Sequence, residues 1–279
     1  MGGVTFKRYM KLLALYAKMD LASLTRDTKF MIIAVASDIL ADVSAISGVF
    51  LVAWRFGGIG GLDKYEILFM LAFGGIVNGL ITMFDHGNAS FPSRIIGRGQ
   101  WEHMFIMPLP YGAQMLAGFF PFTYSGKFVT GVIMISVAAA NVSAVLTARF
   151  FILLVINIFI SAVVVIALSY LVSSLAFYAP AQCEEISSSV RYGAEYTATF
   201  PLSGMPRYMV VPLVTVFPAG LIAWLPTLII LGRAPVWANV YPLAFAAMLS
   251  VAAAYCFGRG FRYYVRRSIN RYAAFGHRS

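Results

Sequence analysis

The stretch FFILLVINIFISAVVVIALSYLVSSLAFY, residues Phe150–Tyr178, carries no charged side chain from one end to the other. A helix needs about 20 mostly apolar residues to cross the roughly 30 Å of hydrocarbon in a bilayer. Phe150–Tyr178 meets that requirement with residues to spare. It therefore predicts a membrane-spanning helix and sets the fold class for the segments on either side.

The remainder of the chain has the same apolar character. Of its 279 residues 60% are hydrophobic and only 11% are charged, and the mean hydropathy is +0.80. A soluble domain normally carries about 25% charged residues. A chain this apolar cannot cover itself with polar surface, so most of its solvent must be lipid.

Further candidate spans lie on both sides of this stretch. With it they cover Phe30–Trp54, Ile67–Phe84, about Phe128–Val145, Phe150–Tyr178, Tyr208–Leu231 and Val236–Phe257. We therefore predict an all-α fold, a polytopic membrane bundle of six transmembrane helices that forms one domain over residues 1–279.

The basic residues orient these spans, because cytoplasmic loops carry an excess of Lys and Arg. With the N-terminus inside, six spans return the C-terminus to the same side and leave few basic residues outside. Those few are Arg55, Lys64, Arg149 and Arg233. We expect a multi-pass protein of the cytoplasmic (inner) membrane with both termini inside and a basic tail, residues 259–272, that touches acidic lipid. This asymmetry explains the net charge of +10 without nucleic acid.

The N-terminal segment has the pattern of an amphipathic helix. Apolar residues recur on one side, and Lys7, Lys11 and Lys18 lie on the other. A basic helix of this type lies flat on the membrane surface near anionic headgroups. We predict an interface helix over residues 4–26, in a segment without the apolar core and cleavage site of a signal peptide.

A polar loop, SRIIGRGQWEHMFIMPLP, separates the second and third spans at Ser93–Pro110. Its polar side chains recur near the i, i+4 repeat of a helix: Arg94, Arg98, Glu102 and His103. Its apolar side chains can face the membrane or the ends of the spans: Ile95, Ile96, Trp101, Phe105 and Ile106. Prolines at 108 and 110 end the helix. A short surface helix over residues 93–107 suits docking, although an ordinary interfacial loop would show the same pattern.

Two acids interrupt the first span. Asp38 and Asp42 are four residues apart, on one helix face and roughly 10 Å or more past the cytoplasmic end. A charge at such depth costs about 2.5–3.5 kcal/mol, so it normally faces a cavity or a partner. Asn78 and Asn157 can meet these acids from other spans. The group is either a translocation lining for a cationic or amphipathic substrate or an interhelical hydrogen-bond cluster.

The fifth span carries Pro212, Pro218 and Pro226, which predict kinks that serve as hinges or as static bends. The segment before it has charges that we interpret as the solvated face of a cytoplasmic helix. They are Glu184, Glu185, Arg191 and Glu195.

No catalytic signature is present in the sequence. It holds no phosphate-binding glycine loop, H-E-x-x-H, C-x-x-C or G-x-S-x-G. The three histidines and two cysteines lack metal-ligand spacing. We therefore expect no catalytic residue, metal or cofactor in this chain.

The loop RIIGRGQWEHMFIMPLP resembles the I-R-x-G-x-L-D-x-x-L-x-x-P element of ABC-2 type transporter permeases. FPLSGMPRYMVVPLVTVFPAGLIAWLPTLIILGR, Phe200–Arg233, and the aromatic pair Phe177–Tyr178 are similar to later segments of that family, in the same order. The branch is that of bacterial daunorubicin-like or uncharacterised exporters. The chain departs from the family where Trp101-Glu102-His103 replaces the common Leu-Asp.

The resemblance implies a six-span permease subunit that pairs with a separate cytoplasmic ATPase, which binds ATP and magnesium. It implies two ATPase copies and two permeases, identical or related, that work by alternating access, with a lipid, peptide or drug-like substrate for export. The coupling helix would present Arg94, Arg98, Trp101, Glu102 and His103. The alternatives are a non-transporting membrane scaffold and an ion-coupled carrier that uses Asp38 and Asp42.

Overall fold

The computed structural model describes residues 11, 14–15, 18–19, 22, 25–84, 92–99, 101, 125–142 and 147–267. Nearly all of this part is helical. The main helices are α2 (Thr28–Phe56), α3 (Lys64–Phe84), α4 (Pro92–Gly97), α7 (Gly126–Asn141), α8 (Ala148–Ser173), α9 (Pro180–Thr197), α10 (Arg207–Thr215), α11 (Trp224–Ile230) and α12 (Val240–Arg267). Two short strands, β1 (Gly58–Ile59) and β2 (Leu62–Asp63), join α2 to α3, and four 3-10 turns complete the order: η2 (Ser174–Phe177), η3 (Leu202–Gly204), η4 (Pro218–Leu221) and η5 (Val236–Asn239).

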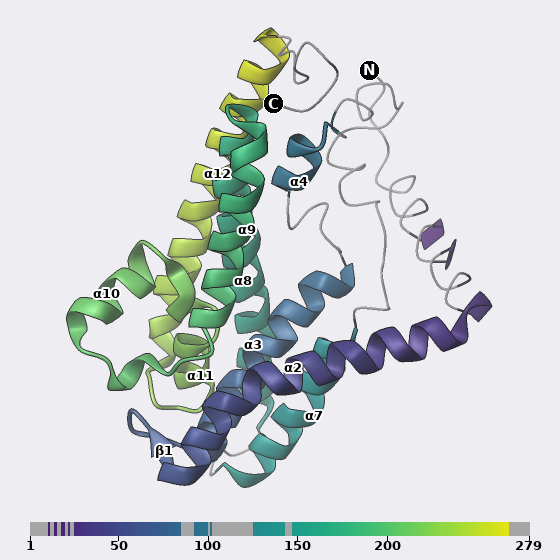
Figure 1. Cartoon of the computed structure of the whole chain (residues 1–279). Helices are drawn as coiled ribbons and strands as arrows, with labels where there is room; N and C mark the ends of the chain where they lie inside the picture. Colours follow the sequence, from purple (N-terminus) through teal and green to yellow (C-terminus); the bar gives the residue numbers. More distant parts are fainter. Residues whose placement is uncertain are drawn as a thin grey trace.

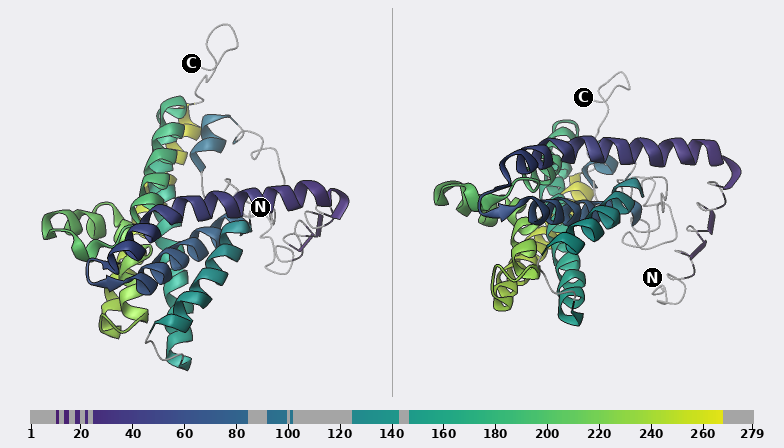
Figure 2. Two further views of the ribbon diagram at one scale, coloured as in Figure 1. Left: turned by 60° about the horizontal axis from the view of Figure 1, so that its bottom comes forward. Right: turned by 90° about the horizontal axis from the view of Figure 1, so that it is seen from below.

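Helices α8, α9 and α12 stand side by side and form the upright part of the molecule (Figure 1). Helices α3 and α7 pack against each other below them, and α2 lies across this pair with its N-terminal half projecting beyond the bundle (Figures 1 and 2). The short helix α4 sits near the upper end of α9. Sequence-distant helices thus meet at the crossing of α2, α3 and α7 with α9.

Four helical segments are long and apolar enough to cross a membrane. They are Thr28–Phe56, Lys64–Met83, Ala148–Phe177 and Val236–Arg266. Helix α7 has only 16 residues, fewer than the roughly 20 that a span requires. Among the described residues, length and composition therefore support four spans, or five if the bent pair of α10 with η4–α11 is one. This multi-pass helical architecture fits the predicted class, while the count of six spans stays a prediction.

The fifth predicted span, Tyr208–Leu231, is bent in the structure, as its prolines indicated. The segments Arg207–Thr215 and Pro218–Ile230 are bent by 71° relative to each other. Phe217 leaves the helical region with φ −119° and ψ 90°, and Pro218 after it has no backbone N–H to continue the hydrogen-bond ladder. The bend makes this segment a broken span or a re-entrant loop.

The turn between α2 and α3 is fixed by its sequence. Gly60 and Gly61 have φ values of 61° and 81°. A two-residue hairpin turn of this type requires positive φ at both positions, and glycine adopts it most readily. Asp63 Oδ1 then accepts hydrogen bonds from the backbone N–H groups of Tyr65 and Glu66, and Glu66 Oε2 accepts one from Asp63 N. This reciprocal capping box begins α3.

The same Glu66 also ties the start of α3 to the loop before α12. Arg233 Nε and its NH2 nitrogen donate to the two Glu66 carboxylate oxygens at 2.8 and 2.9 Å. Arg233 is exposed, and this two-pronged bond raises its pKa above the ordinary value. The bond joins two segments that the sequence places 167 residues apart.

Glycines allow α3 and α7 to approach closely. A Cβ atom on Gly131 would lie 2.9 Å from the backbone N of Ile76, and one on Gly79 would lie 2.5 Å from the backbone N of Phe128. Such distances are shorter than van der Waals contact, and the obstructing atoms belong to the backbone. The α3–α7 pair therefore depends on the absence of side chains at both positions.

We expect Gly131→Ala to lower the free energy of unfolding by about 1–3 kcal/mol, the usual cost of overpacking a core. Gly48→Ala in α2 is the matched control, because a Cβ there meets nothing within 4 Å. Both changes improve helix propensity equally. Thermal unfolding of the detergent-purified variants measures the difference, and equal melting temperatures would contradict the close-packing argument.

Candidate functional site

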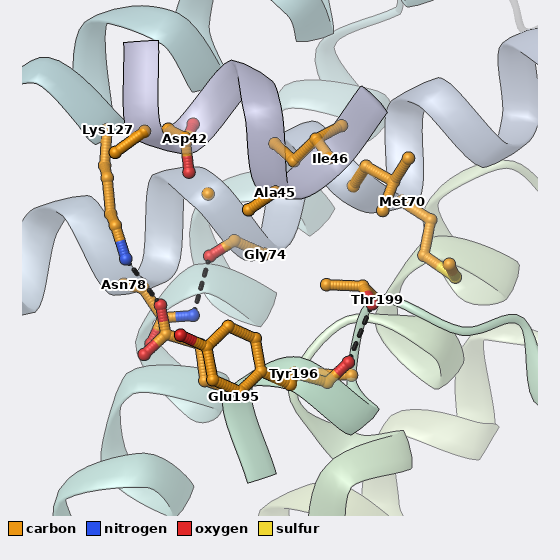
Figure 3. Close-up of a pocket in the computed structure, with 14 residues that line it drawn as sticks. Asp42, Ala45, Ile46, Met70, Gly74, Asn78, Lys127, Glu195, Tyr196 and Thr199 are labelled. Carbon is orange, nitrogen blue, oxygen red and sulfur yellow. Dashed lines mark hydrogen bonds and ion pairs between the residues drawn. The ribbon is translucent and has the colours of Figure 1, made fainter. Parts of the chain in front are cut away.

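A small cavity lies where α2, α3, α7 and α9 meet. It has a volume of about 150 Å³ and is walled mostly by small or apolar residues. Four charged or amide side chains, one from each helix, reach it: Asp42, Asn78, Lys127 and Glu195. Figure 3 shows Lys127 joined to Glu195 at the left of the view, with Asp42 at the top beside the Lys127 side chain. We call these four residues and the adjacent Arg191 the polar junction.

Hydrogen bonds run through the polar junction from α7 to α9 to α3. Lys127 Nζ donates to Glu195 Oε1 at 2.7 Å, and an Arg191 NH1 donates to Glu195 Oε2 at 3.3 Å. The NH2 nitrogen of Arg191 donates to Asn78 Oδ1 at 2.8 Å. Glu195 is thus the counter-ion of both Lys127 and Arg191, and Arg191 links α9 to α3.

Arg191 is the deepest charge in the polar junction, with 3% of its side chain exposed. Burial lowers the pKa of its guanidinium, and the Glu195 carboxylate opposes that shift. A buried cation of this kind is costly unless a counter-ion and hydrogen bonds accompany it. The position of Glu195 is therefore essential to the way α9 packs.

The two acids of α2 have different surroundings. Asp38 Oδ2 accepts a hydrogen bond from the backbone N of Lys127 at 3.0 Å, so this carboxylate caps the first turn of α7. Gly126 makes room for it, since a Cβ there would lie 2.7 Å from Asp38 Oδ2. Asp42 is 6% exposed, and within the described part of the chain its Oδ2 atom has no hydrogen-bond partner. The Oδ2 atom of Asp42 is thus a buried polar atom of the polar junction that no described hydrogen bond satisfies.

Helix α4 forms a second candidate site, at the end of the bundle away from the β1–β2 turn (Figure 1). Its Ile95 and Ile96 are buried, and Trp101 just beyond it packs edge-on against an aromatic group. The rings around Trp101 belong to Phe177, Phe257 and Phe261, at 5.9 to 6.0 Å. The end of α8 and the last turns of α12 thus hold the element from beneath.

One ion pair ties this element to the start of α9. Arg98 Nε and NH2 donate to Glu184 Oε1 at 3.2 and 3.0 Å. The backbones approach closely beside it, because a Cβ on Gly97 would lie 3.0 Å from the Pro180 carbonyl oxygen. The Arg98 side chain is 54% exposed, so it remains accessible from outside. We call α4 with Arg98 the docking element.

Comparison with known proteins decides the family. A family model described as ABC-2 family transporter protein matches residues 39–268, from the middle of α2 to the end of α12. The chain belongs to the ABC-2 transporter family. It is therefore a membrane component of an ATP-binding cassette transporter, in a family whose members generally associate with an ATPase subunit and carry no ATPase site of their own. No curated protein and no solved structure matched the chain.

The structure of this ABC-2 protein brings some of the sequence-predicted lining residues together. Asp42 and Asn78 both line the cavity, and Asp38 lies beside it at the start of α7. Asn157 does not join them: it is buried in α8, where its Nδ2 donates to the Leu153 carbonyl. Whether any of the four contacts a substrate stays a prediction.

Three charged members of the polar junction were not recognised from the sequence. Lys127 was not a candidate residue, and Arg191 and Glu195 were interpreted as part of a solvated face. The interpretation of Arg191 and Glu195 as a solvated face is wrong, because both side chains are largely buried. A signal was available: the buried residues of α9 include Cys183, Ser187, Arg191 and Ala194, a helical repeat of small residues around one arginine.

The docking element also differs from the expected continuous helix over residues 93–107. Helix α4 ends at Gly97, and Gly99 follows with φ 68°, a left-handed turn that interrupts the helix. Trp101 is 2% exposed, so it supports the element from inside and does not present a surface to a partner. Arg94 is half-buried, and Glu102 and His103 lie outside the described residues.

The structure also locates the predicted hinge prolines and two lysines of the N-terminal segment. Pro212 lies inside α10, Pro218 begins the turn after the bend, and Pro226 is buried in α11. The break is therefore at Pro218, and whether it moves is untested. Lys11 and Lys18 are exposed helical residues, as an interface helix requires, and Lys7 lies outside the described residues.

Proposed function

We propose that this ABC-2 protein is the permease subunit of an exporter driven by a separate cytoplasmic ATPase through alternating access. Membership of the family supports the permease role. The observation that carries the coupling mechanism is the position of α9. Its first turn holds Glu184 against the docking element, and its last turns hold Arg191 and Glu195 in the polar junction.

Helix α9 thus connects a surface contact with a buried cavity. Glu184 and Glu195 are eleven residues apart, which is roughly 16 Å along a helix. A helix is stiff over this distance, so displacement of the docking element by a partner moves the far end of α9. That movement changes the bonds from Glu195 to Lys127 and from Arg191 to Asn78, which hold α7 and α3 in place.

The buried Oδ2 atom of Asp42, which has no hydrogen-bond partner among the described residues, supports a lining role for this cavity in the proposed transport cycle. An acid without a hydrogen-bond partner at Oδ2, inside a membrane protein, is retained at a cost and normally has a functional reason. We propose that it faces the route of a cationic or amphipathic substrate within the lipid, peptide or drug-like class. Two permeases, identical or related, and two ATPase copies with ATP and magnesium would complete the complex in the inner membrane, with both termini inside.

The proposal is tested by mild-detergent purification of the tagged chain from its native membranes, followed by mass spectrometry and an ATP hydrolysis assay. We expect a stoichiometric nucleotide-binding subunit and ATP hydrolysis in the purified complex. A second permease would appear in the same sample. Recovery of the folded chain without an ATPase in several detergents would contradict the proposal and favour a scaffold or an ion-coupled carrier.

A further inference from the structure

The last turns of α12 carry a basic hollow that the proposed transport cycle does not use. It has a volume of about 510 Å³ and is lined by Tyr178, Arg259, Arg262, Tyr263 and Arg266. Helical geometry places the three arginines and Tyr263 within roughly a quarter of the helix circumference. The opposite side of the same turns is fixed, because Phe257 and Phe261 pack around Trp101. The hollow therefore stands on a rigid support.

The arginines around this hollow have no acidic partner in the part of the chain that the structure describes. Tyr178 and Tyr263 stack with ring centroids 4.6 Å apart and form an aromatic wall beside the guanidinium groups. A guanidinium presents a planar fork of donors that matches the oxygens of a phosphate group.

The depth of the hollow matches the lipid headgroup layer. Helix α12 has 28 residues, roughly 40 Å in length, which exceeds the hydrocarbon thickness by about 10 Å. Trp237 and Tyr241 are exposed at its other end and are typical of an interfacial aromatic belt. About 20 residues beyond Tyr241 the helix leaves the hydrocarbon, at the level where Arg262 and Arg266 begin to project.

We propose that this hollow is a binding site for the phosphate headgroup of an anionic membrane lipid. Arg262 and Arg266 hold the phosphate oxygens, Arg259 adds charge from the hydrocarbon side, and the Tyr178–Tyr263 wall contacts the glycerol and the first acyl carbons. This is a defined site, unlike the general attraction of a basic tail to an acidic surface. It does not depend on transport or on an ATPase.

The test measures binding of fluorescent phosphatidylglycerol and phosphatidylcholine to the detergent-purified chain. We expect a clear preference for phosphatidylglycerol, and Arg262→Gln with Arg266→Gln should weaken its binding about thirtyfold, since each basic residue at an anionic surface contributes roughly fivefold. The matched control, Arg55→Gln with Arg149→Gln, removes the same charge from exposed residues at the end of α2 and the start of α8 and should leave binding unchanged. All four residues are exposed, so folding is preserved, which the melting temperature verifies.

A third variant distinguishes a defined binding site from general attraction to surface charge. Arg262→Lys with Arg266→Lys keeps the charge but loses the planar fork, so we expect a clear loss of affinity, smaller than with glutamine. Full retention with lysine, equal losses in the site and control variants, or no preference over phosphatidylcholine would overturn the proposal. Inorganic phosphate forms the last arm: if it displaces the lipid at concentrations that leave ionic strength unchanged, the site takes free phosphate and the lipid assignment is wrong.

Discussion

Charge reversal at Arg98 should abolish ATP hydrolysis that depends on the permease, while the chain stays folded. Arg98→Glu places two carboxylates against each other at the contact between the docking element and α9, where Arg98 now donates to Glu184. The pair is partly exposed, so its loss should cost no more than about 1 kcal/mol of stability. The ion-pair link from the docking element to α9 is lost, because the two carboxylates repel each other.

The second reversal identifies which contact matters. Glu184→Arg combined with Arg98→Glu restores an ion pair of opposite polarity, and we expect it to recover ATP hydrolysis in the purified complex. Recovery would show that Arg98 acts through α9. Loss in both the single and the double variant would assign Arg98 to a direct contact with the ATPase. Arg149→Glu, a reversal at an exposed arginine on α8, is the control and should leave hydrolysis unchanged.

Hydropathy predicted the long helices well, because length and the absence of charge are properties of a continuous segment. The stretch Phe150–Tyr178 appears in the structure as α8 followed by the turn η2. The fifth span was less predictable. Its prolines indicated kinks, but three candidates in one segment do not say which one breaks the helix, and tertiary packing selected the position just before Pro218.

Of the five residues of the polar junction, only Asp42 and Asn78 were predicted to lie at a buried site. Asp42 and Asn78 were identified because a polar group inside a span is costly wherever it points. Lys127 and Glu195 lie near the ends of apolar segments, where a charge is ordinarily solvated and carries no signal. Only the crossing of α7 and α9 over α3 brings these charges to one cavity, and a single sequence does not contain that crossing.

Loss of the carboxylate at Glu195 should destabilise the protein more than any other single change in the polar junction. Glu195→Gln leaves Lys127 and Arg191 without their shared counter-ion, and Arg191 is 3% exposed. Breaking a buried pair by removal of one partner costs about 3–5 kcal/mol. Thermal and denaturant unfolding in detergent measure this loss. Lys127→Met in the same chain removes one of the two orphaned cations, so the double variant should regain part of the stability, as a coupled pair requires.

Asp42→Asn is the contrasting change in the same cavity, because the Oδ2 atom of Asp42 has no hydrogen-bond partner among the described residues. Asparagine has nearly the same shape and removes a buried charge, so the melting temperature should stay the same or rise. If Asp42 faces the substrate route, the ATP hydrolysis rate of the complex should change even though the fold does not. A drop in stability like that of Glu195→Gln would show that Asp42 holds the helices together. If both stability and hydrolysis stay unchanged, this carboxylate has no part in the transport mechanism. The proposed mechanism then rests on the movement of α9.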